Sequence, residues 1–180
     1  MEAGGRLRLF VALLLPDEAI ASLVQWQAAE LAGPPRPRAV PAENLHVTVA
    51  FLGGRPAGDV AQIAGLLRET AAEARPPVFE PIRYRETRSV AMIVLSDHEE
   101  RGAWLAERVF ESLEELGVYR REKREWLPHV TVARFRERPR LSPPLPPLDQ
   151  VMSSEVAVMM SRLRPSGAEY EILESVSLGG

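Results

Sequence analysis

The sequence contains no cysteine among its 180 residues. This absence excludes disulfide bonds, a catalytic thiolate and every zinc site built on cysteine ligands. Long apolar runs are absent too, because no segment approaches the roughly 20 residues that cross a bilayer as a helix. Residues 9–15 after Arg6 and Arg8 mimic a short signal peptide, but residues 16–18 (Pro-Asp-Glu) interrupt the stretch. A buried first strand explains the same residues better, so we expect a cytoplasmic protein without a membrane segment.

The sequence also lacks a strong net charge and the motifs of several common enzyme classes. A net charge of −3 gives no overall basic field for nucleic acid. No G-x-G-x-x-G, G-x-x-x-x-G-K-[ST] or G-x-S-x-G pattern is present, so dinucleotide-binding, P-loop and serine-hydrolase functions have no support. One local basic segment suits a phosphorylated ligand. Its members are Arg120, Arg121, Lys123, Arg124, Arg134, Arg136, Arg138 and Arg140, against Glu122, Glu125 and Glu137.

Histidine is scarce, and two of the three histidines begin near-identical hexapeptides, H-V-T-V-A-F at 46–51 and H-V-T-V-A-R at 129–134. Residues i and i+2 of a strand share a face, so histidine and threonine project together while the valines turn the other way. Core packing needs only the valines. The repetition therefore predicts one shared site in which His46 and His129 supply acid/base groups and Thr48 and Thr131 supply hydroxyls. An imidazole pKa of about 6.5 lets one ring be protonated while the other is neutral.

A metal site is not predicted. Two histidines on separate strands lack the third ligand that zinc expects, threonine is a poor ligand, and neither motif contains a carboxylate. The third histidine, His98, lies beside Asp97 and Glu99 in an expected strand-to-helix turn, and we predict that it is a solvated surface residue.

Apolar periodicity predicts alternating strands and helices. The expected strands are 7–15, 45–52, 78–85, 89–95, the second motif, 156–163 and 169–178; the expected helices run from 16 to about 32, from 60 to about 75 and from 99 to 116. Gly53 and Gly54 are expected to end the first motif strand, and the proline-rich segments 35–43 and 139–147 to form loops. The repeated hexapeptide indicates two related α+β halves that face each other across a cleft.

Paired H-x-T-x strands in a chain of this size resemble the 2H phosphoesterase superfamily. More narrowly, the chain is similar to the RNA 2′,3′-cyclic phosphodiesterase family, historically called 2′-5′ RNA ligases. The resemblance covers almost the whole chain. It is carried by residues 8–12 with 16–18, by 41–53 around the first motif, by 128–134 around the second and by 170–173 near the end.

The resemblance implies one bilobal α+β domain over residues 1–180, with two pseudo-symmetric halves of mostly antiparallel sheet lining a central cleft and helices outside. It implies metal-independent hydrolysis of an RNA 2′,3′-cyclic phosphate end to a 2′-phosphate, without a cofactor and by a monomer. His46 would be the proton donor and His129 the proton acceptor, although this direction is less firmly implied than the pair. Thr48 and Thr131 would hold the phosphate oxygens.

Several residues depart from the family pattern, and they leave alternatives open. A regular strand would place Arg134 with Val130 and Val132, so it reaches the cleft as a phosphate ligand only through twist, a bulge or the end of the strand. The chain has residues 38–40 (Arg-Ala-Val) where the family often has an aromatic residue, and residues 88–95 lack an expected tryptophan. Alternatives are a non-catalytic RNA-binding module, and cyclic-phosphate hydrolysis on small nucleotides or ADP-ribose. Ligation, the reverse reaction, is a further candidate activity.

Overall fold

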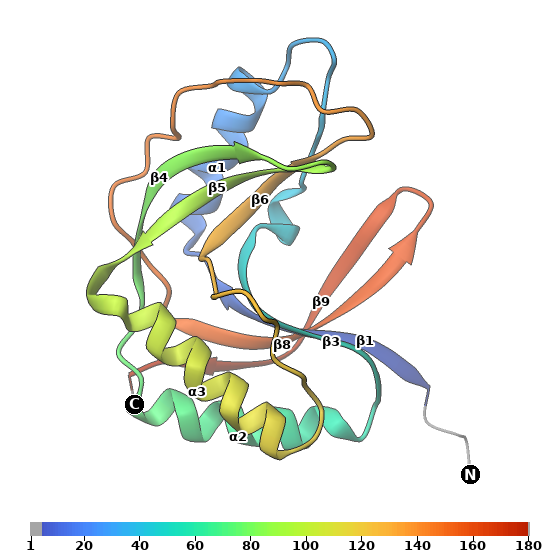
Figure 1. The fold of residues 1–180 in the computed structure, drawn as a ribbon, viewed down its shortest axis with the longest axis vertical. Coiled ribbons are helices and arrows are strands. Elements are labelled where there is room, and N and C mark those ends of the chain that lie inside the picture. The colour runs from blue at the N-terminus through green and yellow to red at the C-terminus, as the bar shows by residue number, and fades with distance from the viewer. Residues whose placement is uncertain (1–4, 180) are drawn as a thin grey trace.

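The computed structural model describes residues 5–179, and these form one curled antiparallel sheet with helices outside it (Figure 1). The strands are β1 (Arg6–Leu14), β2 (Arg38–Ala39), β3 (His46–Pro56), β4 (Val78–Glu86), β5 (Val90–Asp97), β6 (His129–Arg134), β7 (Val151–Met152), β8 (Glu155–Arg164) and β9 (Gly167–Ser177). The helices are α1 (Asp17–Glu30), α2 (Asp59–Glu73) and α3 (Arg101–Glu115), with short 3-10 turns η1 (Ala42–Asn44) and η2 (His98–Glu100). The strand order is β7-β4-β5-β6-β3-β1-β8-β9, and β2 pairs with β6.

The two motif strands are neighbours at the middle of this sheet. β3 and β6 run antiparallel, and Val47 lies opposite Val130 as their registered pair. β6 belongs to a half that also contains β2, β4, β5 and β7, whereas β3 belongs to a half with β1, β8 and β9. The predicted α+β fold with two antiparallel halves is therefore confirmed, and the halves join in one continuous sheet.

β1 explains how both faces of the β3 half are occupied. Leu9, Val11 and Leu13 are almost fully buried in the main core. The alternate residues Phe10 and Ala12 are equally buried on the other face, in a second, smaller apolar cluster. Burial on both faces is why β1 reads as a nearly continuous apolar run rather than as an alternating one.

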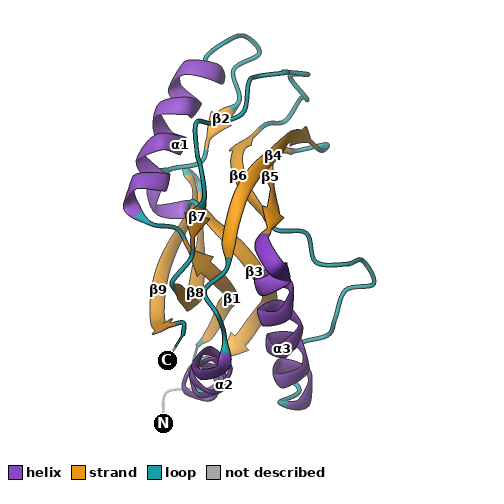
Figure 2. Ribbon diagram, turned by 90° about the vertical axis from the view of Figure 1, so that its left-hand side faces the viewer, coloured by secondary structure: helices purple, strands orange, loops and turns teal. Residues whose placement is uncertain are grey.

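The helices cover the outer faces of the two halves. α2 and α3 pack together beneath the β3 half in Figure 1, and α1 lies along one side of the β6 half in Figure 2. Leu23 and Trp26 are buried on α1, as are Ile63 on α2 and Leu105 on α3, as their helical spacing predicts. No helix in the described part of the chain is both long and apolar enough to cross a membrane.

One sequence-based boundary was wrong. Gly53 and Gly54 were expected to end the first motif strand, but β3 continues to Pro56. The ladder between β1 and β3 shifts its register by one residue here, pairing Leu9 with Gly53 and Phe10 with Phe51. Gly53 adopts a φ of 68°, which glycine reaches without a steric penalty. The glycine therefore absorbs a bulge inside the strand instead of ending it.

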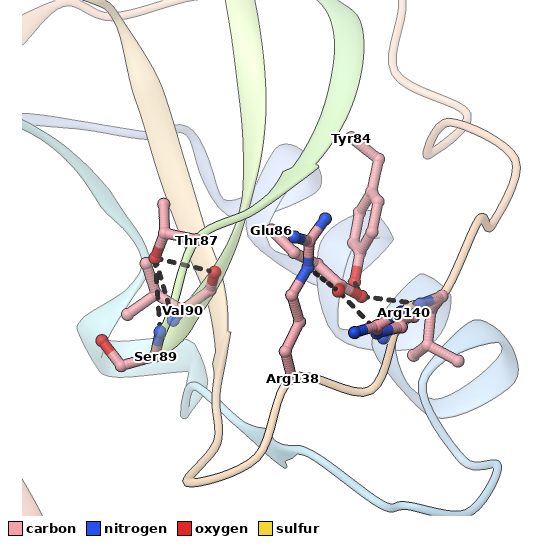
Figure 3. A network of polar contacts seen from close by, with 8 residues as sticks. Tyr84, Glu86, Thr87, Ser89, Val90, Arg138 and Arg140 are labelled. Carbon is pink, nitrogen blue, oxygen red and sulfur yellow. Dashed lines mark hydrogen bonds and ion pairs between the residues drawn. The ribbon is translucent and has the colours of Figure 1, made fainter.

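A buried carboxylate fixes the segment that follows β6. The side chain of Glu86 is only 2 % exposed and, as Figure 3 shows, its oxygens accept four hydrogen bonds, from Tyr84 Oη (2.8 Å), Arg138 Nε (3.1 Å), and the backbone N–H groups of Arg140 (2.9 Å) and Leu141 (2.7 Å). Burial raises the pKa of Glu86, but these donors outweigh burial and hold the pKa below its usual range. Glu86 therefore anchors the chain just beyond the second motif.

Candidate active site

The two H-x-T motifs meet at one cavity. His46 and Thr48 from β3 and His129 and Thr131 from β6 all line a cavity of about 410 Å³. The intervening valines, Val47 among them, point the other way and are buried. The alternation of a strand thus separates four polar side chains from the core, and the antiparallel β3–β6 pairing brings the two sets together.

His46 lies in an aromatic environment. Its ring centroid is 5.1 Å from that of Phe10, and 5.5 Å from that of Tyr170, which meets it edge-on. Its Nε2 atom is 2.9 Å from the Thr48 hydroxyl oxygen, so the histidine and the threonine of this motif are hydrogen-bonded to each other. Its Nδ1 atom is buried without a well-formed hydrogen bond.

Burial governs the charge of His46. The pKa of His46 is lowered from 6.5 to about 4, chiefly because burial removes solvent from the ring. The positive charges of His129 and Arg134 act in the same direction, and the Asn44 backbone partly opposes them. His46 is therefore neutral near pH 7 in the free protein, and a bound anion would be needed to favour its protonated form.

His129 is held by its backbone surroundings. Its Nδ1 atom lies 2.8 Å from the carbonyl oxygen of Leu127. A carbonyl only accepts, so the proton of the neutral ring is on Nδ1, and Nε2 carries a lone pair. Trp126, just before it, donates from Nε1 to the Thr48 carbonyl at 3.0 Å and ties the approach to β6 onto β3.

A β-bulge occurs at the same place in both motifs. Across from Val11 and Ala12 of β1, β3 has the extra residue Val49, and across from Ala91 and Met92 of β5, β6 has the extra residue Val132. Each bulge puts two successive residues into the core, so the alternation resets after it. The next residue on each strand, Phe51 and Arg134 respectively, consequently lines the cavity.

The bulge on β6 has a dedicated partner on α1. The Val132 carbonyl oxygen accepts from Nε2 of Gln27 at 2.7 Å and from the Val40 N–H at 3.0 Å. The same Gln27 nitrogen donates to the Val40 carbonyl at 3.0 Å. Gln27 is only 5 % exposed. Inside the core, its amide gives the Val132 carbonyl a hydrogen-bond donor that a buried carbonyl needs. The buried Gln27 amide thus has partners, and its contact with Val132 stabilises the bulge that places Arg134 at the cavity.

Sequence reasoning missed the outer wall of the cavity. Arg38 of β2, Asn44 of η1 and Tyr170 of β9 all line it. The Asn44 amide donates to the Ala168 carbonyl at 2.8 Å and joins the first motif to β9. Of these residues, Asn44 and Tyr170 carried a signal, as parts of the family-like segments 41–53 and 170–173. Arg38 lies in segment 35–43, which its prolines predict to be a loop.

The local basic segment does not converge on the cavity. Among its eight cationic residues, Arg134 lines the cavity and the other seven do not. Arg121 forms ion pairs with Glu107 and Glu114 instead, and Arg138 pairs with Glu86. His98 is exposed, as predicted, with its side chain 53 % accessible. The charge run between Val118 and Arg140 is thus mostly a solvated surface.

The cavity is lined by basic side chains and hydroxyl groups. Of the described residues, no Asp or Glu lines it, whereas two imidazoles, two threonine hydroxyls and two guanidinium groups do. Within residues 5–179, no cluster of three or more His, Asp or Glu side chains has the arrangement of a metal site. Such a donor set binds an anion with tetrahedral oxygens and can move protons beside it.

The curled sheet with two H-x-T strands at one cavity defines a protein of the 2H phosphoesterase type. Residues 15–159 match the sequence profile of the 2′-5′ RNA ligase superfamily, and the chain belongs to that family. It is 31 % identical to the RNA 2′,3′-cyclic phosphodiesterase of Thermus thermophilus over 97 % of this chain and 91 % of the relative. A protein of the same name from Archaeoglobus fulgidus is 33 % identical over 73 % of this chain and 74 % of its own length.

Solved structures share the fold. The TT0787 protein of Thermus thermophilus superposes with a TM-score of 0.78 at 29 % identity, covering 96 % of this chain and 98 % of its own. LigT of E. coli in its apo form gives a TM-score of 0.77 at 23 % identity and covers 98 % of this chain and 99 % of its own. LigT has also been crystallised with 3′-AMP.

Proposed function

We propose that this chain hydrolyses the 2′,3′-cyclic phosphate at an RNA end to a 2′-phosphate, with His46 and His129 as its acid/base pair. The observation that carries the proposal is the convergence of both H-x-T motifs on one cavity that no carboxylate of the described chain enters. The activity named for the Thermus thermophilus and Archaeoglobus fulgidus relatives supports the substrate.

Two histidines at one cavity can supply the two proton transfers of this hydrolysis. The neutral His129 ring has its proton on Nδ1, so Nε2 can take a proton from water as the water oxygen bonds to phosphorus. The bond from phosphorus to the 3′ oxygen breaks, and protonated His46 gives its proton to that oxygen. Thr48, Thr131 and Arg134 donate hydrogen bonds to the non-bridging oxygens, where negative charge accumulates. The products are a 2′-phosphate and a free 3′ hydroxyl.

This mechanism requires a shift in the protonation of His46. NMR titration of its Cε1 resonance should give a pKa of about 4 in the free protein, rising when inorganic phosphate is added, because the anion stabilises the imidazolium. The folded chain should also lose stability as pH falls from about 6.5 toward 4, since in that window only the unfolded chain binds the proton. A midpoint near 6.5 that phosphate does not move would contradict the assignment.

The direct test is a product assay on a short oligonucleotide that ends in a 2′,3′-cyclic phosphate, with the 2′- and 3′-phosphate products separated. We expect the 2′-phosphate alone, and undiminished turnover in excess EDTA, because imidazoles and hydroxyls rather than a metal ion are proposed to act. Loss of activity in EDTA would overturn metal independence. Salt-sensitive RNA binding without turnover would favour the RNA-binding alternative.

A further inference from the structure

Arg38 and Arg134 form an unusual pair. They lie directly opposite each other in the β2–β6 pairing, and both line the cavity. Neighbouring strands are about 4.8 Å apart, and like charges placed directly opposite are destabilising. Neither arginine forms an ion pair with a carboxylate within residues 5–179. Two uncompensated guanidinium groups on one wall are therefore better explained by an anionic ligand than by a contribution to stability.

The two arginines occupy different depths of the site. Arg134 is close enough to His46 for its charge to contribute to the lowered pKa of that ring. Arg38 instead donates from Nη1 to the Ser166 carbonyl at 2.9 Å, at the tip of the β8–β9 hairpin. Gly167 leaves room for this contact, because a Cβ there would lie 2.9 Å from Arg38 Nη2. The Arg38 guanidinium is thus held against the hairpin tip at the edge of the cavity, and the rest of its N–H donors remain for a ligand.

A second cavity begins on the far side of the same segment. It has a volume of about 610 Å³ and is bordered by Arg36, Arg38, the C-terminal part of α1 and Leu31 just after that helix. Arg38 borders both cavities. A polyanionic strand that leaves the first cavity toward the second would therefore pass Arg38 and then Arg36.

We propose that Arg38 binds the phosphodiester that joins the terminal nucleotide of the RNA to the nucleotide before it. This rests on the proposed function and extends it: the histidines and Arg134 engage the terminal cyclic phosphate, and Arg38 engages the next phosphate along the strand. Arg38 is then a specificity-determining residue that makes the site prefer an oligonucleotide end over a mononucleotide.

Three substrates isolate this contact: a nucleoside 2′,3′-cyclic phosphate, the same compound with a 5′-phosphate, and a dinucleotide ending in the cyclic phosphate. For the unmodified chain, the 5′-phosphate should raise kcat/KM roughly 10- to 100-fold, as a charge-assisted hydrogen bond would. Arg38→Ala should lose most of that ratio. Arg38→Lys should keep part of it, because lysine retains the charge without the planar fork. Arg108→Ala, which removes the same charge from exposed α3, should leave the ratio unchanged.

Equal losses on all three substrates in Arg38→Ala would overturn the proposal, since they would mean that Arg38 acts on the reacting phosphate or only shapes the cavity. The absence of any gain from the 5′-phosphate in the unmodified chain would overturn it as well. Circular dichroism checks folding, and Arg38→Gln replaces Arg38→Ala if the latter unfolds. No turnover of any of the three by the unmodified chain would instead overturn the proposed function, and the Arg38 site with it.

Discussion

Replacing either His46 or His129 with alanine is expected to lower kcat by about 10²- to 10⁴-fold, the usual contribution of a positioned acid or base. Each variant removes a side chain that lines the cavity and leaves the opposite wall in place. The double variant should be little worse than either single one, because groups that act in one concerted step are not additive. Single-turnover assays on a cyclic-phosphate-ended oligonucleotide measure all three.

His98→Ala is the matched control, because it removes the remaining histidine of the chain from an exposed position outside the cavity. It should keep full activity. The thermal unfolding temperatures of the single variants need to stay near that of the unmodified chain, since both histidines border buried residues of their strands. If both single variants retained normal turnover, the paired-histidine assignment would be wrong.

The roles of the two histidines can be separated with a substrate whose 3′ bridging oxygen is replaced by sulfur. A thiol has a pKa of about 8.5, so a thiolate leaves without a proton and no longer needs a general acid. His46→Ala should therefore recover most of its loss on this substrate, by about 10²-fold or more relative to the oxygen substrate. His129→Ala should recover nothing, because water still needs a base.

The opposite result would exchange the roles. Rescue of His129→Ala alone would identify His46 as the base. The lowered pKa of His46 bears directly on this choice. A ring that is neutral in the free protein suits a base directly, whereas an acid role needs the bound phosphate to raise its pKa from about 4. The sulfur substrate thus tests whether the bound phosphate raises the pKa of His46 enough to offset the lowering caused by burial.

Periodicity was sufficient for the long elements. The apolar spacing located α1, α2 and α3, and alternation placed His46 with Thr48 and His129 with Thr131 on one face. These predictions rest on forces that act within about ten residues, such as the burial of one face of a strand or a helix. The two-residue strands β2 and β7 were not predicted, because each exists only through its partner strand.

The long-range features of the site could not be read from the sequence. Valine and alanine at residues 49–50 and 132–133 fit a regular strand as well as a bulged one, and only the register with β1 and β5 decides between them. Arg134 therefore required the structure. The place of Arg38 at the cavity could not be predicted for a related reason. It depends on pairing with β6 and on a contact with the backbone of a hairpin far along the chain.

The equivalent positions of Phe51 and Arg134 have a consequence for regioselectivity. A site with perfect twofold symmetry would accept the five-membered cyclic phosphate in either of two orientations, and either P–O bond could break. The repeat places identical chemistry on both strands but follows one bulge with an aromatic ring and the other with a cation. In the proposed reaction, duplication supplies the paired proton-transfer groups, and the difference between Phe51 and Arg134 adds to the unequal surroundings of the two histidines in giving the ligand one preferred direction. An asymmetric cavity of this kind is what the proposed reaction needs in order to give the 2′-phosphate rather than the 3′-phosphate.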